Sequence, residues 1–438
     1  MRLVSRFVWG LARFAAWIFY RIERVGPRPP AGPLLIIANH PNGLLDPVLV
    51  VTTSERTPRF LAKSPLFTMP FVGWFVRGSG AIPVYRRQDA GVDVTKNREM
   101  FAAVDEALDA GDCVCLFPEG TTHSSGHLEP LKTGAARIVM AAEARGLAVA
   151  IVPVGLNLDR KAEMRSTATV SYGRPFFADD VAHDVADRVD ALTALMRDRL
   201  RDVMVEASPL GEHELVRRID RIYSAFHRLA PGADAKLTRR RAIASGLQAL
   251  RERDPRRFDE IVDEVGRYDR RLRRFGLLEQ TVGADVSRAT ALRFAAREVV
   301  LFVALMPVVL VGAAAFAVPY RVIDLAVRRL GTHLEEEATY KVIGGLVIHT
   351  AWMGLVALLT GSRWGAGWGW LAVAALPGVA VATLLAWERE RAVLATVRSY
   401  LAWQTLSPRA ARALIGQRAG LARLMDETYA WLHGQESL

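Results

Sequence analysis

Three long stretches without a charged residue constrain the fold most. They span Val299–Tyr320, Val342–Ser362 and Trp364–Trp387, and they contain 22, 21 and 24 residues. An α-helix needs about 20 apolar residues to cross a bilayer, so each stretch is long enough. Hydrophobic residues make up 51% of the chain beside 24% charged residues, which requires the apolar residues to be concentrated. We therefore assign residues 298–388 to two or three membrane segments.

The charges around these stretches favour two crossings. Three crossings would separate Arg389 and the arginines after it from the basic segment that ends at Arg297, against the tendency of basic residues to share one side. Pro307 and Gly312 interrupt the first stretch, so we expect a bent re-entrant or interfacial segment there. The other two would form a hairpin that turns at residues 361–363. Its far end would carry interfacial tryptophans, which are Trp364, Trp368 and Trp370.

Arginines are interleaved with aromatic residues at the amino terminus. The apolar run from Phe7 to Tyr20 contains Arg13, and no small-residue cleavage site follows before Arg21, unlike a signal peptide. Residues 1–24 are therefore predicted to form an amphipathic helix at the membrane interface. An ordinary packing helix is the alternative.

Residues 25–178 alternate short apolar runs with helical patterns. The alternation predicts an α/β domain with a mostly parallel central sheet flanked by helices. Cys113 and Cys115 are the only cysteines; we interpret them as a reduced pair, which fits a cytoplasmic-facing domain. The expected strands are 34–38, 59–62, 82–85, 113–117 and 148–156, and the expected helices are 94–108 and 134–144.

A basic helical region, residues 179–297, and a helical tail, residues 389–438, complete the chain. Residues 236–297 hold 16 Lys and Arg against 9 Asp and Glu, which is +7 of the net +11. This charge suits anionic lipid headgroups, where each basic residue contributes ~1 kcal/mol of attraction, or it belongs to a solvated helical face. No motif for nucleic-acid readout accompanies it, so we expect no nucleic-acid partner.

A histidine and an aspartate follow the first predicted strand in the segment Asn39–Pro47. Neutral histidine is suited to remove a proton from a hydroxyl near pH 7, and a carboxylate on its other nitrogen fixes the tautomer. His40 and Asp46 are six residues apart, so a regular helix would separate them. Pro41 and Gly43 favour an irregular turn, which would let the pair close.

Three further motifs follow at strand ends. Arg86 ends a short strand and suits bidentate phosphate binding, whereas Arg87 would point the other way. Phe117–Thr122 contains Pro-Glu-Gly, a turn in which Glu119 can accept hydrogen bonds from a polyol or orient its neighbours. Lys132 would face a phosphate or solvent. The fourth motif is a buried strand with a proline, Pro153.

The order and spacing of these four motifs resemble the glycerophosphate acyltransferase superfamily, the PlsC-like lysophospholipid acyltransferases. The resemblance covers residues 25–175 and implies the PlsC-like fold. It implies His40 as the base, Asp46 as its orienting partner and Arg86 as the phosphate-binding residue. The other motif positions would bind or shape the substrates: Asn39, Glu119, Gly120, Thr121, Lys132 and Pro153.

The resemblance also implies the chemistry. The acceptor hydroxyl would attack an acyl thioester directly, with acyl-CoA or acyl-ACP as co-substrate and with no cofactor and no covalent acyl-enzyme. His123 and His127 lie beside the third motif without a further ligand pattern, so we expect no metal. The partners would be the lipid bilayer, the acyl carrier and a glycerol-phosphate acceptor.

One departure bears on the acceptor. The family commonly places four residues between histidine and aspartate, and this chain has five. The longer form resembles the branch of fungal glycerol-3-phosphate and dihydroxyacetone-phosphate acyltransferases, with 1-acylglycerol-3-phosphate or another lysophospholipid as the alternative acceptor. A non-catalytic membrane scaffold is the rival outside the enzymes. We expect an integral membrane protein, in a bacterial inner membrane, with its catalytic domain on the cytoplasmic face.

Overall fold

The computed structural model describes residues 2–69, 72–86, 94–207, 211–284, 288–330 and 334–434. The chain divides into two compact units, each treated by itself. Unit 1 comprises residues 1–213, 232–241 and 332–342. Unit 2 comprises residues 214–231, 242–331 and 343–438.

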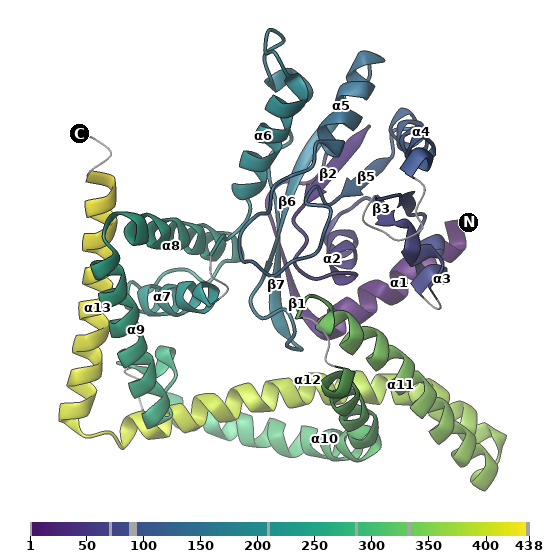
Figure 1. Cartoon of the computed structure of the whole chain (residues 1–438). Helices are drawn as coiled ribbons and strands as arrows, with labels where there is room; N and C mark the ends of the chain where they lie inside the picture. The colour runs from purple at the N-terminus through teal and green to yellow at the C-terminus, as the bar shows by residue number, and fades with distance from the viewer. Residues whose placement is uncertain are drawn as a thin grey trace. The chain divides into compact units, whose positions relative to one another are not determined.

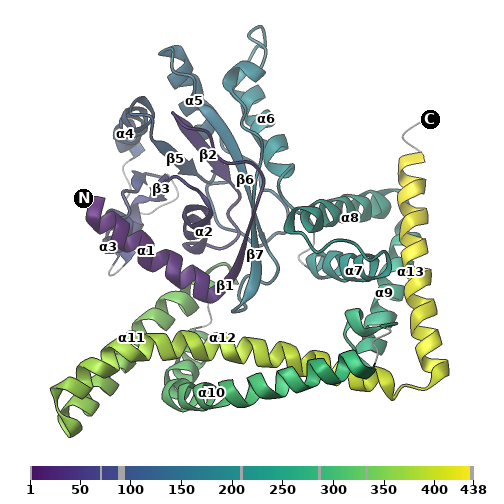
Figure 2. The same cartoon turned by 180° about the vertical axis from the view of Figure 1, so that it is seen from behind.

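Unit 1 is built on a seven-stranded sheet of order β1-β7-β6-β2-β5-β3-β4. Figure 2 labels the strands of this sheet from β1 to β3. All neighbouring strands pair in parallel except β6 and β7. The sequence-based expectation of a mostly parallel sheet flanked by helices is confirmed. The strands are β1 (Tyr20–Val25), β2 (Leu34–Ala38), β3 (Arg59–Lys63), β4 (Ile82–Val84), β5 (Cys113–Leu116), β6 (Ala150–Leu158) and β7 (Ser166–Tyr172).

Helices cover both faces of this sheet (Figure 1). One face of β2, carrying Leu34 and Ile36, packs against α1 and α2, and the other, carrying Leu35 and Ile37, packs against α4, α5 and α6. Burial on both faces explains why the central strands are continuous apolar runs. The helices of this unit are α1 (Arg2–Phe19), α2 (Leu45–Thr53), α3 (Val72–Gly78), α4 (Asn97–Asp109), α5 (Gly134–Ala144) and α6 (Arg188–Arg201).

The first helix is shorter than predicted. It ends at Phe19, and residues 20–25 form β1, so residues 20–24 belong to the sheet and not to an amino-terminal helix. Tyr20 is fully buried, which a strand start inside the core requires. α1 also packs: Trp9 and Ala16 are buried in the same core, while Phe7, Phe14 and Trp17 point outward.

The antiparallel pairing of β6 and β7 places the first residues of β7 and β1 at the edge of the sheet where β2 and β5 end. Parallel strands need a long crossover, whereas residues 159–165 form a short loop that only an antiparallel partner can follow. β7 therefore starts where β6 ends, beside the carboxyl ends of β2 and β5. β1 runs parallel to β7 and pairs Tyr20 with Ser166, so Tyr20 also lies at this edge.

Unit 2 is helical. Its polar contacts include Tyr223 Oη donating to Asp426 at 2.7 Å and Tyr268 Oη donating to Glu279 at 3.1 Å. Several arginines of the basic region are paired within the unit, such as Arg267 with Glu264. The helices are α7 (Glu212–Phe226), α8 (Ala233–Arg253), α9 (Pro255–Phe275), α10 (Arg288–Leu330), α11 (Leu334–Trp364), α12 (Ala366–Gln404) and α13 (Pro408–Gly434). The first residues of α7, α8 and α11 belong to unit 1.

The first apolar stretch is an unbroken helix, contrary to the expected break. α10 continues through Pro307 and Gly312. Gly312 is a packing site, because a Cβ there would lie 1.7 Å from Thr383 Oγ1 of α12. Small residues allow such close approach between membrane helices.

A neighbouring helix compensates for a second proline in α10. Pro319 has no N–H to donate to Ala315 O, four residues earlier. Trp352 Nε1 of α11 donates to that carbonyl at 2.7 Å. A helix surrounded by lipid tolerates proline when a neighbour satisfies the freed carbonyl, which this contact does.

Gly155 of β6 provides a test of the packing in unit 1. A Cβ at Gly155 would lie 2.0 Å from the backbone oxygen of Val203, which cannot rotate away. We expect Gly155→Ala to lower the free energy of unfolding by about 1–3 kcal/mol. Gly134→Ala is the control, since no atom lies within 4 Å of a Cβ there. Thermal unfolding of the full chain in detergent measures both; equal melting temperatures would contradict the packing.

Candidate active site

The residues between β2 and α2 form a tight turn that brings His40 and Asp46 together. Asp46 lies in the first turn of α2, which begins at Leu45. Gly43 adopts φ = +51°, where glycine avoids the steric penalty of a side chain. The Leu45 N–H donates to Asn42 O at 3.2 Å. His40 Nδ1 and Asp46 Oδ2 are 2.8 Å apart, so the turn closes the pair despite its extra residue.

Asp46 is fully buried. Its Oδ2 also accepts the Asn42 N–H at 2.7 Å. Burial raises the pKa of the Asp46 carboxyl, and hydrogen bonds from His40 and the Asn42 N–H oppose that rise. A carboxylate at Nδ1 makes Nδ1 the protonated ring nitrogen and leaves a lone pair on Nε2. The arrangement therefore suits His40 as a base that acts through Nε2.

The imidazole is packed but reachable. Its ring stacks on Phe117 with centroids 4.1 Å apart and planes 13° apart, and 18% of the His40 side chain is exposed. His40 O accepts the His123 N–H at 3.3 Å. These contacts fix the ring between the first motif and the third.

Glu119 supports His40 from behind. It is 3% exposed, and its Oε1 accepts the His40 backbone N–H at 2.8 Å. Its Oε2 accepts the Glu129 N–H at 2.9 Å and contacts His123 Nε2. Both oxygens are engaged by protein donors, so Glu119 orients neighbouring groups and does not present a free carboxylate to a polyol.

Three of the expected binding residues meet at one backbone position. Arg86 Nη1 donates to Gly120 O at 2.8 Å. Gly120 adopts φ = +70°, and a Cβ there would lie 2.6 Å from Lys132 Nζ. Arg86 and Lys132 thus form a pair of cationic groups over the Pro-Glu-Gly turn. Arg87 lies outside the described residues.

The remaining expected residues are placed differently. Asn39 is buried and pairs with the main chain of Leu156, accepting its N–H at 2.7 Å and donating to its O at 3.2 Å. Its amide joins β2 to β6 and does not face a substrate. Thr121 is exposed on the turn after Gly120. Pro153 lines a cavity of about 270 Å³ bordered by Tyr172 and Arg174, with no residue of the first three motifs in its lining.

A series of hydrogen-bonded polar groups lies beside His40 and was not predicted from the sequence. Asn42 Nδ2 donates to Tyr20 Oη at 2.7 Å, and Tyr20 Oη donates to Lys161 O. Burial raises the pKa of the Tyr20 phenol, so it stays protonated. Lys161 Nζ donates to Pro41 O at 3.1 Å. Nothing in the spacing of Tyr20 and Lys161 indicates these contacts, because only the antiparallel β6–β7 pair brings them together.

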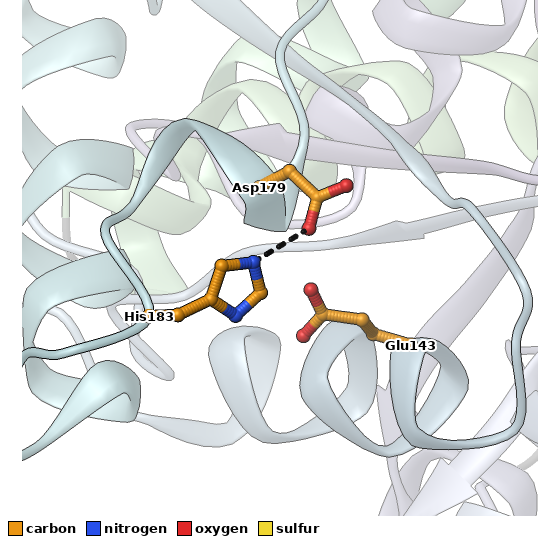
Figure 3. A group of neighbouring side chains, drawn as sticks. All are labelled: Glu143, Asp179 and His183. Atoms are coloured by element: carbon orange, nitrogen blue, oxygen red, sulfur yellow. Dashed lines mark ion pairs between the residues drawn. The ribbon is translucent and has the colours of Figure 1, made fainter.

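Among the described residues, Glu143, Asp179 and His183 lie close enough together to ligate a metal ion (Figure 3). Both oxygens of Glu143 already accept from Arg188, at 3.0 and 3.1 Å. The side chains of Asp179 and His183 are 75% and 71% exposed. Since a guanidinium occupies the one shielded carboxylate, we interpret the group as a surface ion-pair cluster and assign no metal to it.

Comparison with known proteins agrees with this geometry. Residues 20–157 match the family model described as Acyltransferase, which covers the His40–Asp46 turn, Arg86 and the Pro-Glu-Gly motif. This part of the chain is an acyltransferase domain. The resemblance inferred from the motifs is confirmed.

Curated relatives span several acceptors. The chain is 28% identical over 206 residues to glycerol-3-phosphate O-acyltransferase 2 of Saccharomyces cerevisiae, covering 45% of this chain and 27% of that protein. It is 28% identical over 148 residues to the chloroplastic 1-acyl-sn-glycerol-3-phosphate acyltransferase LPAT1 of Arabidopsis thaliana, covering 33% and 38%. It is 32% identical over 167 residues to lyso-ornithine lipid O-acyltransferase of Brucella abortus, covering 37% and 58%. The chain thus spans less than two thirds of the length of each of these relatives.

A solved structure is also similar. The crystal structure of the 1-acyl-sn-glycerophosphate acyltransferase PlsC from Thermotoga maritima aligns with a TM-score of 0.35 at 19% identity, covering 45% of this chain and 78% of that one.

The contact between His123 and Glu119 predicts a pH dependence of stability. The Glu119 carboxylate raises the pKa of His123 above its ordinary 6.5. A raised folded-state pKa stabilises the fold fully below pH 6.5, and this contribution is lost as pH rises through the folded pKa. We expect His123→Asn to lower the melting temperature most at acidic pH and least at alkaline pH.

Thermal unfolding of the full chain across this pH range measures the effect. His127→Asn is the control, because the His127 side chain is 45% exposed. A difference between wild type and His123→Asn that stays constant with pH would exclude the proposed protonation.

Proposed function

We propose that this chain transfers a fatty acyl group from a thioester carrier, acyl-CoA or acyl-ACP, to a hydroxyl of glycerol-3-phosphate or dihydroxyacetone phosphate. The observation that carries the proposal is the 2.8 Å contact between His40 Nδ1 and Asp46 Oδ2 inside an acyltransferase domain. It supplies a base of fixed tautomer beside a partly exposed ring face.

The chemistry follows from that base. The acceptor hydroxyl gives its proton to His40 Nε2 as its oxygen bonds to the thioester carbonyl carbon. Asp46 stabilises the imidazolium that results. The carbon–sulfur bond then breaks, and the imidazolium returns the proton to the leaving thiolate. Atoms and charge balance without a cofactor or an enzyme-bound acyl group.

The cationic pair at Gly120 supports a phosphorylated acceptor. Arg86 and Lys132 converge on this turn, two residues after Pro118 and directly after the Glu119 that holds His40. Guanidinium and ammonium groups favour phosphate ligands. The yeast relative named for glycerol-3-phosphate supports the small acceptor, and the chloroplast relative supports 1-acylglycerol-3-phosphate as the alternative.

Removing the base should abolish most turnover. General base catalysis contributes ~10²–10⁴-fold, so we expect His40→Ala to lower kcat by about that factor. Asp46→Asn should lower kcat as well, because an amide can leave the wrong ring nitrogen protonated. His127→Ala, an exposed histidine nearby, is the control. The assay measures labelled acyl transfer to glycerol-3-phosphate, dihydroxyacetone phosphate and 1-acylglycerol-3-phosphate; near-normal transfer by His40→Ala would refute the mechanism.

In the part of the chain that the structure describes, three helices are long and apolar enough to cross a membrane: Arg293–Ile323, Glu337–Trp364 and Ala366–Gln404. We propose that only the last two cross, as a hairpin. Glu298, at the start of the first helix, contacts Arg389, at the end of the third. Two paired charges lie on one side of a bilayer, so the number of crossings between them is even.

A second contact identifies the helix that does not cross. Ala338, at the start of α11, is fully buried in the core of unit 1, and Lys341 Nζ donates to Ala162 O at 2.9 Å. The start of α11 therefore lies on the same side as the rest of unit 1. No candidate span occurs before Arg293 in the described part of the chain, which keeps Glu298 on that side too. α10 then begins and ends on one side, and we propose that it lies in the near half of the bilayer.

The outward face of α1 supports lipid contact by unit 1 as well. Phe7, Phe14 and Trp17 are 65%, 48% and 42% exposed, on the face opposite to buried Trp9 and Ala16. Aromatic residues exposed along a helix whose other face is in the core are typical of an interfacial helix. We propose that α1 rests on the membrane on the cytoplasmic side.

Cysteine labelling tests this topology. Cys113 and Cys115 are buried, and burial raises the pKa of Cys113 to about 12, so the native thiols should not react. In sealed vesicles with unit 1 outward, a membrane-impermeant maleimide should label Arg329→Cys and Ser407→Cys. The structure continues α11 to Trp364, so the hairpin turns at Gly365 and not at residues 361–363 as expected. Ser362→Cys, in the last turn of α11, should be labelled only after detergent.

Asp179→Cys marks the side of unit 1, because the Asp179 side chain is 75% exposed. Protection of Arg329→Cys while Asp179→Cys is labelled would mean that α10 crosses. Labelling of Ser362→Cys without detergent would mean that the hairpin does not.

A further inference from the structure

Lys161 lies in the β6–β7 loop, outside the four motifs. We propose that Lys161 binds a phosphate group of a substrate next to His40, in addition to the cationic pair formed by Arg86 and Lys132. The inference rests on the proposed function, because it takes the bound phosphate to be part of a reacting molecule.

The ammonium group of Lys161 reaches two of the motif loops. Its Nζ donates to Pro41 O, the residue after the base, at 3.1 Å. It also contacts Ser124 Oγ in the loop after the Pro-Glu-Gly motif. Arg86 contacts Gly120 O, four residues before Ser124 in the same loop. Lys161 therefore brings a positive charge to the carbonyl of Pro41, the residue that follows His40.

The backbone of Lys161 is fixed as firmly as its side chain. Its carbonyl accepts from Tyr20 Oη, and Tyr20 is fully buried and held in turn by Asn42. Glu163, two residues after Lys161 in the same loop, pairs with Arg160. A surface lysine samples many rotamers, whereas this one is anchored at both ends. Such pre-organisation lowers the entropy lost when a ligand binds.

Charge explains why an anion belongs here. Lys161 lies near enough to Asp46 and His123 to favour the ionised carboxylate and oppose protonation of His123. During the proposed reaction an imidazolium would form one residue from the Pro41 carbonyl that Lys161 contacts, and like charges repel. A phosphate bound to Lys161 offsets that repulsion. Lys161 thus assists His40 only when the bound substrate supplies a negative charge.

Two substrates carry phosphate. In glycerol-3-phosphate the phosphate is a few bonds from the attacked hydroxyl, so a phosphate held beside Pro41 keeps that hydroxyl near His40. Acyl-CoA carries phosphates at the far end of its pantetheine arm. The shared chemistry is phosphate binding, and separate KM values distinguish the two sources.

The test compares three variants of the full chain in detergent. Lys161→Met removes the charge, Lys161→Arg keeps it, and Arg160→Met removes one charge from the adjacent residue, whose side chain is 59% exposed. Loss of a hydrogen bond to a charged group should raise the KM of the phosphate-bearing substrate by about tenfold or more in Lys161→Met. Lys161→Arg should recover most of the affinity, and Arg160→Met should match wild type.

The pattern of kinetic constants decides the outcome. A rise in the KM for glycerol-3-phosphate alone assigns the acceptor phosphate, and a rise for acyl-CoA alone assigns the donor. In either case the inhibition constant of inorganic phosphate should rise in parallel. A lower kcat with both KM values and phosphate inhibition unchanged would show that Lys161 only positions the Pro41 loop. That result, or no change at all, overturns the proposal.

A binding measurement separates this inference from the proposed function. Inorganic phosphate should raise the melting temperature of wild type and Arg160→Met by more than that of Lys161→Met, in which the pair of Arg86 and Lys132 remains. If no acceptor is acylated and this difference persists, the proposed function fails and the phosphate site stands. If acyl transfer is found and phosphate shifts all three proteins equally, the function stands and the role of Lys161 fails.

Discussion

The fully buried carboxylate of Asp46 is the constraint on which the site depends. A desolvated charge is costly unless hydrogen bonds compensate it, and here the donors are His40 Nδ1 and the Asn42 N–H. Both donors come from the same turn, and the start of α2 adds its favourable dipole for an anion. A second buried carboxylate, Glu119, holds the backbone of His40. Asp46 thus holds the ring of His40 through a hydrogen bond, and Glu119 holds its main chain through another.

Sequence reasoning succeeded where the information is local. β2 and α5 have the bounds expected from their apolar patterns, Leu34–Ala38 and Gly134–Ala144. The closure of the His40–Asp46 pair was expected because Pro41 and Gly43 disfavour a regular helix, and Gly43 does take a positive φ. Such features follow from a few neighbouring residues, whose preferences act over one turn.

Sequence reasoning failed where contacts join distant segments. β1 and β7 are short and partly polar, and their pairing depends on a reversal of direction that no motif signals. Asn39 was expected to bind substrate, yet its side chain hydrogen-bonds to the main chain of Leu156, 117 residues away in the sequence. Pro307 was expected to break a helix, but α10 continues through it. Tertiary partners decided the pairing of β1 with β7 and the place of Asn39.

The reversal between β6 and β7 also bears on how such an enzyme can diversify. In an all-parallel sheet the chain that leaves β6 would return to the opposite edge of the sheet through a crossover connection, usually a helix, before the next strand begins. Here it turns back within residues 159–165, and this loop contacts the turn of His40 through Lys161 and the start of α11 through Ala162. Insertions or substitutions in so short a connection alter the surroundings of the base while every motif residue stays intact. The loop is accordingly a site where natural variation can retune acceptor choice without rebuilding the reaction centre.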